Sequence, residues 1–221
     1  MQHRTKLSAR VLPAYSMGEE IMNMVTHITG GAIAIGILVV CLLHANGALS
    51  LTGCAIYGVS MICLYTISSI YHGLRPGTAK KVMQILDHCT IYYLIVSSYT
   101  AVLMCAIIPR YPAIGWSLLC AEWMLAILAT VFTAIDLNKY KVFSMTCYIA
   151  MGWGIALFLP QTIDALTWSG FAWLLSGGIA YTVGAVLYGI GSKRRWFHSV
   201  FHIFVVLGSI LQFFSILFYA I

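Results

Sequence analysis

Two histidines lie four residues apart in the segment KRRWFHSVFHIFVV, which runs from Lys193 to Val206. His198 and His202 therefore share one face of an expected helix, and an H-x3-H pair on one face can supply two corners of a tetrahedral Zn²⁺ site. An imidazole inside an apolar helix is costly unless it has a partner. The spacing thus suggests a bound cation, and interfacial histidines near a helix end are the alternative.

Further polar residues in two other apolar segments lie at the same two expected depths as these histidines. Ser68 and His72 are also four residues apart, and Asp87 lies near the start of the next apolar segment. At a rise of about 1.5 Å per helical residue from the nearest basic residue, His72 and His198 lie about 4–5 Å inside. Ser68, Asp87 and His202 lie about 9–11 Å inside, one turn deeper.

Three imidazoles, a carboxylate and a hydroxyl in two adjacent layers match the parts of a catalytic zinc site. We predict that His72, His198 and His202 bind Zn²⁺ and leave a fourth position for water, as catalytic zinc requires. Asp87 would hold and deprotonate this water, and Ser68 would orient it or donate to a developing oxyanion. Other transition metals stay open, because three imidazoles suit several of them.

A second polar stripe lies in SMGEEIMNMVTHITGG, before the first long apolar run. Ser16 and Glu19 have the spacing of a capping box that starts a helix. Glu20, Asn23 and His27 then fall on one face of that helix. We expect these three to support the metal ligands or to form a gate over the site, and a solvated helix face is the alternative.

Helices that cross a membrane must position these residues. Of the 221 residues, 61 % are hydrophobic and only 8 % are charged, against about 25 % charged in soluble proteins. Apolar runs of about twenty residues recur without two-residue alternation, which favours helices over a barrel. We predict an all-α bundle with seven transmembrane helices, separated by turn segments such as HANGALS, GLRPGTAKK and PQTID. The expected spans are about Val25–Leu43, Leu51–Gly73, Val82–Ile108, Ile114–Ile135, Val142–Leu159, Thr167–Ile190 and Phe197–Ile221.

The basic residues predict the orientation of this bundle. Eleven of the twelve Lys and Arg residues lie on one side of a seven-span chain, and only Arg110 lies on the other. The positive-inside rule then predicts a cytoplasmic N-terminus and an external C-terminus. Residues 1–221 form one expected domain, with a short cytoplasmic tail and helix before the first span. The net charge of +6 indicates topology and contact with anionic lipid headgroups rather than nucleic-acid binding.

The ordered set of these segments resembles the hemolysin III family, the bacterial branch of the progestin and adipoQ receptor group. The matching segments are Glu20-x2-Asn23-x3-His27, SSIYH, LDHCTIYYLIVSSYT, YIAMGW and HSVFH. The resemblance implies a seven-helix fold with a cytoplasmic N-terminus in a bacterial cytoplasmic (inner) membrane. It implies zinc on His72, His198 and His202, with Asp87 and Ser68 beside it. One departure is Ala101, where a proline is usual in the family, and it leaves the bend of the third span open.

Three functions remain open at this point. The first is a zinc-dependent hydrolase of lipid amide or ester bonds at the cytoplasmic leaflet that influences membrane lipid homeostasis, as in the alkaline ceramidases that share this pattern of residues. The second is a receptor or sensor of membrane state in which zinc is structural. The third is the pore-forming cytolysin that the family name implies, although pores need a continuous polar lining. The expected partners are membrane lipids and a lipid substrate, with no nucleic acid, and a homo-oligomer stays open.

Overall fold

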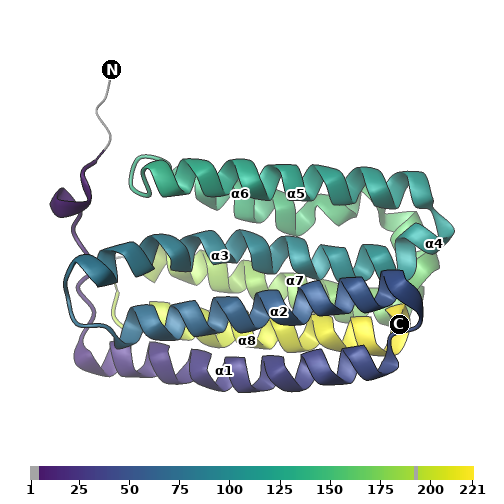
Figure 1. Ribbon diagram of the computed structural model, residues 1–221, viewed down its shortest axis with the longest axis horizontal. Helices are drawn as coiled ribbons and strands as arrows, with labels where there is room; N and C mark the ends of the chain where they lie inside the picture. Colours follow the sequence, from purple (N-terminus) through teal and green to yellow (C-terminus); the bar gives the residue numbers. More distant parts are fainter. Residues whose placement is uncertain (1–4, 192–193) are drawn as a thin grey trace.

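The computed structural model describes residues 5–191 and 194–221, and every regular element within these ranges is helical (Figure 1). The bounds are η1 Leu7–Ala9, α1 Met17–His44, α2 Gly47–Gly73, α3 Thr78–Val102, η2 Leu103–Ile107, α4 Ile108–Arg110, α5 Pro112–Ile135, α6 Lys141–Trp153, η3 Gly154–Phe158, α7 Leu159–Gly191, α8 Phe197–Ser215 and η4 Ile216–Ala220. The prediction of an all-α protein is confirmed for this part of the chain.

Six stretches of the described chain are long and apolar enough to cross a membrane, so the protein is a membrane helical bundle. Five of them correspond to single predicted spans. The sixth, from Lys141 to Ile190, has 50 residues and includes the fifth and sixth predicted spans. Within it Thr167 has a non-helical backbone with φ of 63°.

The break predicted at PQTID lies at Thr167 instead, the first residue of the predicted sixth span, and residues 160–164 themselves are not a turn. These residues are helical and belong to the start of α7. Proline is tolerated in the first turn of a helix, because the amide hydrogen that it lacks would have no partner there. Pro160 is the second residue of α7, so here it begins a helix instead of interrupting one.

The first helix joins two features that the sequence suggested separately. The polar stripe and the first apolar run form one continuous helix, α1. The capping box is confirmed, since the Ser16 side chain accepts from the Glu19 amide and the Glu19 carboxylate accepts from the Ser16 amide. The same carboxylate accepts from the Trp196 amide at 2.7 Å. It therefore ties the start of α1 to the start of α8.

The third apolar stretch, from Thr78 to Arg110, includes the π-helical segment η2, which begins two residues after Ala101. This is the region whose bend the sequence left open.

Helices α2 and α8 bring the histidines together. Ser209 of α8 lies opposite α2, because Tyr57 donates to its carbonyl at 2.9 Å and the hydroxyls of Tyr65 and Ser209 are 2.7 Å apart. His72 follows Tyr65 by seven residues, and His202 precedes Ser209 by seven. Both histidines therefore lie about two turns from this contact, toward the same end of the bundle. That end also holds the start of α1, whereas the C-terminus lies at the other end (Figure 1).

Ten of the twelve Lys and Arg residues, from which the orientation of the bundle in the membrane was predicted, lie within residues 5–191 and 194–221. Arg4 and Lys193 lie outside the described residues.

A buried carboxylate ties the N-terminal segment to the connection between α5 and α6. Asp136 accepts from the Thr5 amide at 2.8 Å and from the amides of Asn138 and Lys139, each at 3.1 Å. Burial opposes ionisation of Asp136, but these amide donors outweigh it and lower the pKa to about 2. The ionised form is therefore the one that the fold stabilises.

Asp136→Asn should lower the melting temperature near neutral pH by about 2–4 °C. A carboxyl group whose pKa is lowered in the folded state stabilises the fold above its unfolded pKa, and this contribution is lost as pH falls through the folded pKa. The difference from wild type should therefore shrink between about pH 4 and about pH 2. Thermal unfolding in detergent measures it, with Asn138→Ala as the control. An equal loss at every pH would contradict the assignment.

Candidate metal centre

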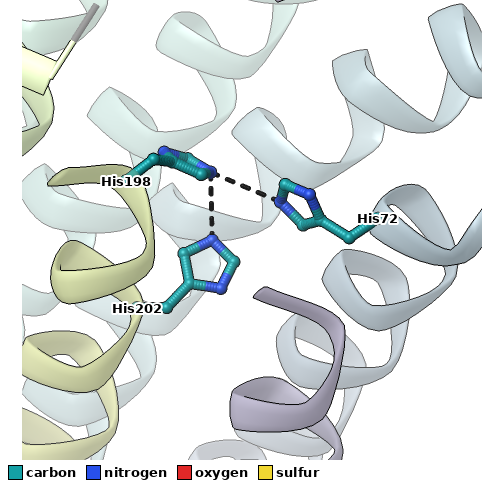
Figure 2. Close-up of side chains that lie close together, drawn as sticks. All are labelled: His72, His198 and His202. Atoms are coloured by element: carbon teal, nitrogen blue, oxygen red, sulfur yellow. Dashed lines mark hydrogen bonds between the residues drawn. The ribbon is translucent and has the colours of Figure 1, made fainter. Parts of the chain in front are cut away.

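Three buried imidazoles converge at one end of the bundle (Figure 2). His72 comes from α2, and His198 and His202 come from α8. The Nε2 atom of His198 lies 3.3 Å from His72 Nε2 and 3.1 Å from His202 Nε2. One ligand nitrogen from each ring lies within 4.8 Å of the others, so this group is close enough to hold a metal ion. The predicted meeting of these three residues is confirmed.

The outer ring nitrogens of two of these histidines contact acceptors. His72 Nδ1 lies 2.6 Å from a carboxylate oxygen of Glu20, with the Asn23 side-chain nitrogen farther away at 3.4 Å, and His202 Nδ1 lies 3.3 Å from the Asn23 carbonyl. A carboxylate or carbonyl oxygen only accepts, so the proton of each neutral ring belongs on Nδ1. The Nε2 lone pairs of His72 and His202 then point toward the centre of the cluster.

The arrangement of the three Nε2 atoms fits a tetrahedral metal ion better than it fits hydrogen bonds between the rings. The ligand atoms of tetrahedral zinc lie about 3.3 Å apart when each bond is about 2.0–2.1 Å long, and the two Nε2 separations of 3.3 and 3.1 Å agree with that. The single lone pair of His198 Nε2 faces two other imidazole nitrogens, so one hydrogen bond cannot serve both. A cation at the centre would satisfy all three lone pairs.

Glu20 belongs to a partly buried ion pair as well as to the histidine contact. Its second carboxylate oxygen lies 2.6 Å from Lys80 Nζ, which also donates to the Leu74 carbonyl at 2.9 Å. Lys80 therefore holds the carboxylate in place, and the carboxylate holds the His72 ring. Such supporting contacts typically contribute 10–100-fold to metal affinity.

Glu20→Gln should weaken metal retention by about 10–100-fold while leaving the three histidines in place. The amide keeps the size of the side chain but loses the charge that orients the His72 ring. Competition against a chromogenic zinc chelator measures the change. Glu122→Gln, which alters a buried carboxyl of α5, is the matched control, and equal retention in the two variants would contradict this role for Glu20.

His27 and Tyr15 cover two faces of the histidine cluster. The His27 ring stacks on His202 with 3.8 Å between centroids, and the Tyr15 ring stacks on His198 at 4.9 Å. Neither nitrogen of His27 has a hydrogen-bond partner in the described part of the chain, although the residue is only 3 % exposed. The stripe of Glu20, Asn23 and His27 thus faces the cluster, whereas sequence reasoning overlooked Tyr15.

Ser68 and Asp87 lie beside the cluster in the wall of a cavity. This inner cavity has a volume of about 110 Å³, and His202, Ser68 and Asp87 all line it. Ser68 is 1 % exposed, and its hydroxyl has no hydrogen-bond partner among the described residues. Asp87 does not belong to the group of potential metal ligands. The rest of the lining is mainly apolar, as a hydrocarbon chain requires.

His88 lines the inner cavity, although helical spacing alone would point it away from the cavity side of the helix. A rotation of about 100° per helical residue points neighbouring side chains in different directions, but both Asp87 and His88 line the inner cavity. His88 Nδ1 bonds the Gln84 carbonyl at 2.8 Å and its Nε2 lies 3.1 Å from the Tyr188 hydroxyl. The cavity is broad enough to include both directions, and only the tertiary structure, which places Tyr188 of α7 beside His88, could reveal this.

Comparisons with known proteins agree with this architecture. A family model described as haemolysin-III related matches residues 15–213. The chain is 37 % identical over 206 residues to Hemolysin-3 of Bacillus cereus, which covers 92 % of both chains. It is 33 % identical over 210 residues to a Hemolysin-3 homolog of Bacillus subtilis (strain 168), covering 94 % of this chain and 97 % of the relative.

A more distant similarity reaches an animal protein. The chain is 24 % identical over 169 residues to the monocyte to macrophage differentiation factor of Homo sapiens, covering 73 % of this chain and 67 % of that protein. The family match spans most of the chain and includes every residue of the histidine cluster. The chain therefore belongs to the haemolysin-III related family of membrane proteins.

Proposed function

We propose that this protein is a zinc-dependent hydrolase of lipid amide or ester bonds. The observation that carries the proposal is the convergence of three imidazole nitrogens beside a mainly apolar cavity that also contains Ser68 and Asp87. His72, His198 and His202 would hold the ion. Zinc bound there would polarise a carbonyl group and lower the pKa of water toward 7.

The remaining steps belong to residues of the cavity wall. Asp87 would accept a proton from the attacking water and pass it to the leaving group. The Ser68 hydroxyl has no other partner among the described residues, so it is free to donate to the oxygen of the scissile carbonyl. The apolar lining would hold the acyl chain and keep bulk water away from the reacting bond.

We further propose seven crossings of a bacterial inner membrane. The stretch from Lys141 to Ile190 has 50 residues, whereas about 20 helical residues span a bilayer, and Thr167 interrupts its helical backbone. Two crossings there would make seven in all, with the N-terminus cytoplasmic. A reporter fused after Ile221 that is active only in the cytoplasm should stay silent, and activity would contradict this topology.

Lipid hydrolysis by the purified protein tests the proposed activity. Incubation with a lipid extract should release free fatty acids, a chelator should stop the release, and added zinc should restore it. Mass spectrometry identifies the product and hence the bond that is cleaved. Metal retention without any product would instead favour a sensor with structural zinc, and ion conductance in a planar bilayer would favour the cytolysin suggested by the relatives' names.

A further inference from the structure

A second and larger cavity lies next to the histidine cluster, at the end of the bundle where α1 begins. We call it the vestibule. Its volume is about 480 Å³. Its wall comes from residues 11–15, from the connection between α5 and α6, from Arg194 and Arg195 between α7 and α8, and from side chains of α1, α3, α6, α7 and α8. Polar and charged groups contribute much more of this wall than of the inner cavity.

The charges that line the vestibule are mainly positive. Lys141, Arg194 and Arg195 contribute to its wall, and Glu19 is the single carboxylate in the described lining. Glu19 already accepts hydrogen bonds from Ser16 and from the Trp196 amide. Neither Lys141 nor Arg194 has an ion pair with any described residue. An excess of positive charge in a concave site attracts anions, and guanidinium groups match the geometry of phosphate oxygens.

The vestibule and the inner cavity share part of their walls. His88, Met145, Tyr148 and Tyr188 line both. The contact between His88 Nε2 and the Tyr188 hydroxyl, at 3.1 Å, lies in this shared wall. A molecule that extends past these four residues would have one end among basic groups and the other among apolar side chains.

The histidine cluster lies at this junction. His198 lines the vestibule, whereas His202 lines the inner cavity with Ser68 and Asp87. The Nε2 atoms of the two histidines are only 3.1 Å apart. A bond between a polar headgroup in the vestibule and an acyl chain in the inner cavity would therefore lie beside the residues proposed to cleave it.

We propose that the vestibule binds the anionic, phosphate-bearing headgroup of a membrane lipid whose acyl chain occupies the inner cavity. This inference rests on the proposed function only in its claim that the bound lipid is hydrolysed. Binding of the lipid does not depend on hydrolysis. It specifies the substrate class as an anionic lipid. A neutral lipid would leave Lys141 and Arg194 without a counter-charge.

The site is tested by measuring how the full chain, in neutral detergent, binds a fluorescent lysophosphatidate. The neutral reference probe is a monoacylglycerol with the same acyl chain and the same fluorophore. Fluorescence anisotropy should show that the wild type prefers the phosphate-bearing probe by at least about tenfold. The double variant K141Q/R194Q should lose most of this preference. Its affinity for the monoacylglycerol should stay unchanged, which would show that the inner cavity is still folded.

The double variant K139Q/R75Q is the matched control. It removes the same charge from the same end of the bundle, but neither residue lines the vestibule. The control should keep the preference for phosphate. Equal loss in both double variants would mean that general surface charge attracts the probe, and this would overturn the proposal. A wild type without any preference would also overturn it.

Inorganic phosphate distinguishes a lipid headgroup from a free anion. Unlabelled lysophosphatidate should displace the probe at a concentration at least about a hundredfold lower than inorganic phosphate does, because the chain contributes apolar burial. Equal potency would overturn the assignment to a lipid. Preferential binding without hydrolysis would contradict the proposed function alone, and hydrolysis without headgroup preference would contradict this inference alone.

Discussion

His198→Ala and His202→Ala will each purify with less than about one tenth of the zinc that the wild type retains. Each variant removes one of three nitrogens that face a common centre, and no other histidine, cysteine or carboxylate among the described residues belongs to the group. Two remaining imidazoles bind zinc too weakly to keep it through purification, since structural and catalytic sites normally use three or four protein ligands.

Inductively coupled plasma mass spectrometry of the purified proteins measures this loss. His44→Ala is the matched control, because His44 lies at the far end of α1 and bonds the Val40 carbonyl at 2.8 Å. The control should retain the metal of the wild type. Full zinc content in both cluster variants would rule out the metal centre and, with it, the proposed hydrolytic chemistry.

Asp87→Asn should reduce kcat for lipid hydrolysis by about 10²–10⁴-fold, the usual contribution of general acid–base catalysis. Asparagine keeps the shape of the side chain, but its amide cannot accept a proton from water. Zinc content should stay near the wild-type value, because Asp87 lies in the cavity wall and does not belong to the group of potential ligands.

Initial rates and zinc content must be measured on the same protein preparations. Glu122→Gln makes the same acid-to-amide change at a buried carboxyl that does not line the inner cavity. This control should keep wild-type turnover. Undiminished turnover in Asp87→Asn would refute the role of Asp87 as the base, while a loss of zinc from that variant would assign it to metal binding instead.

Local sequence signals predicted the helices and the starting point of α1 well. Long apolar runs require helices in a membrane, because backbone groups there must bond within the segment. The capping box of Ser16 and Glu19 follows from spacing alone. Residues PQTID are helical because proline is tolerated in the first turn of a helix, although it disrupts a helix interior, and the break lies at Thr167 instead.

The amino-acid sequence determined which residues could form a site, since helical period and distance from the basic residues placed His72, His198 and His202 at one end. Tertiary structure alone decided the contacts between helices. These include the Glu20 carboxylate at His72, the stacking of Tyr15 on His198, and the entry of His88 into the cavity wall. The physical reason is that helical spacing fixes direction and depth along one helix, whereas rotation and packing between helices depend on all their side chains at once.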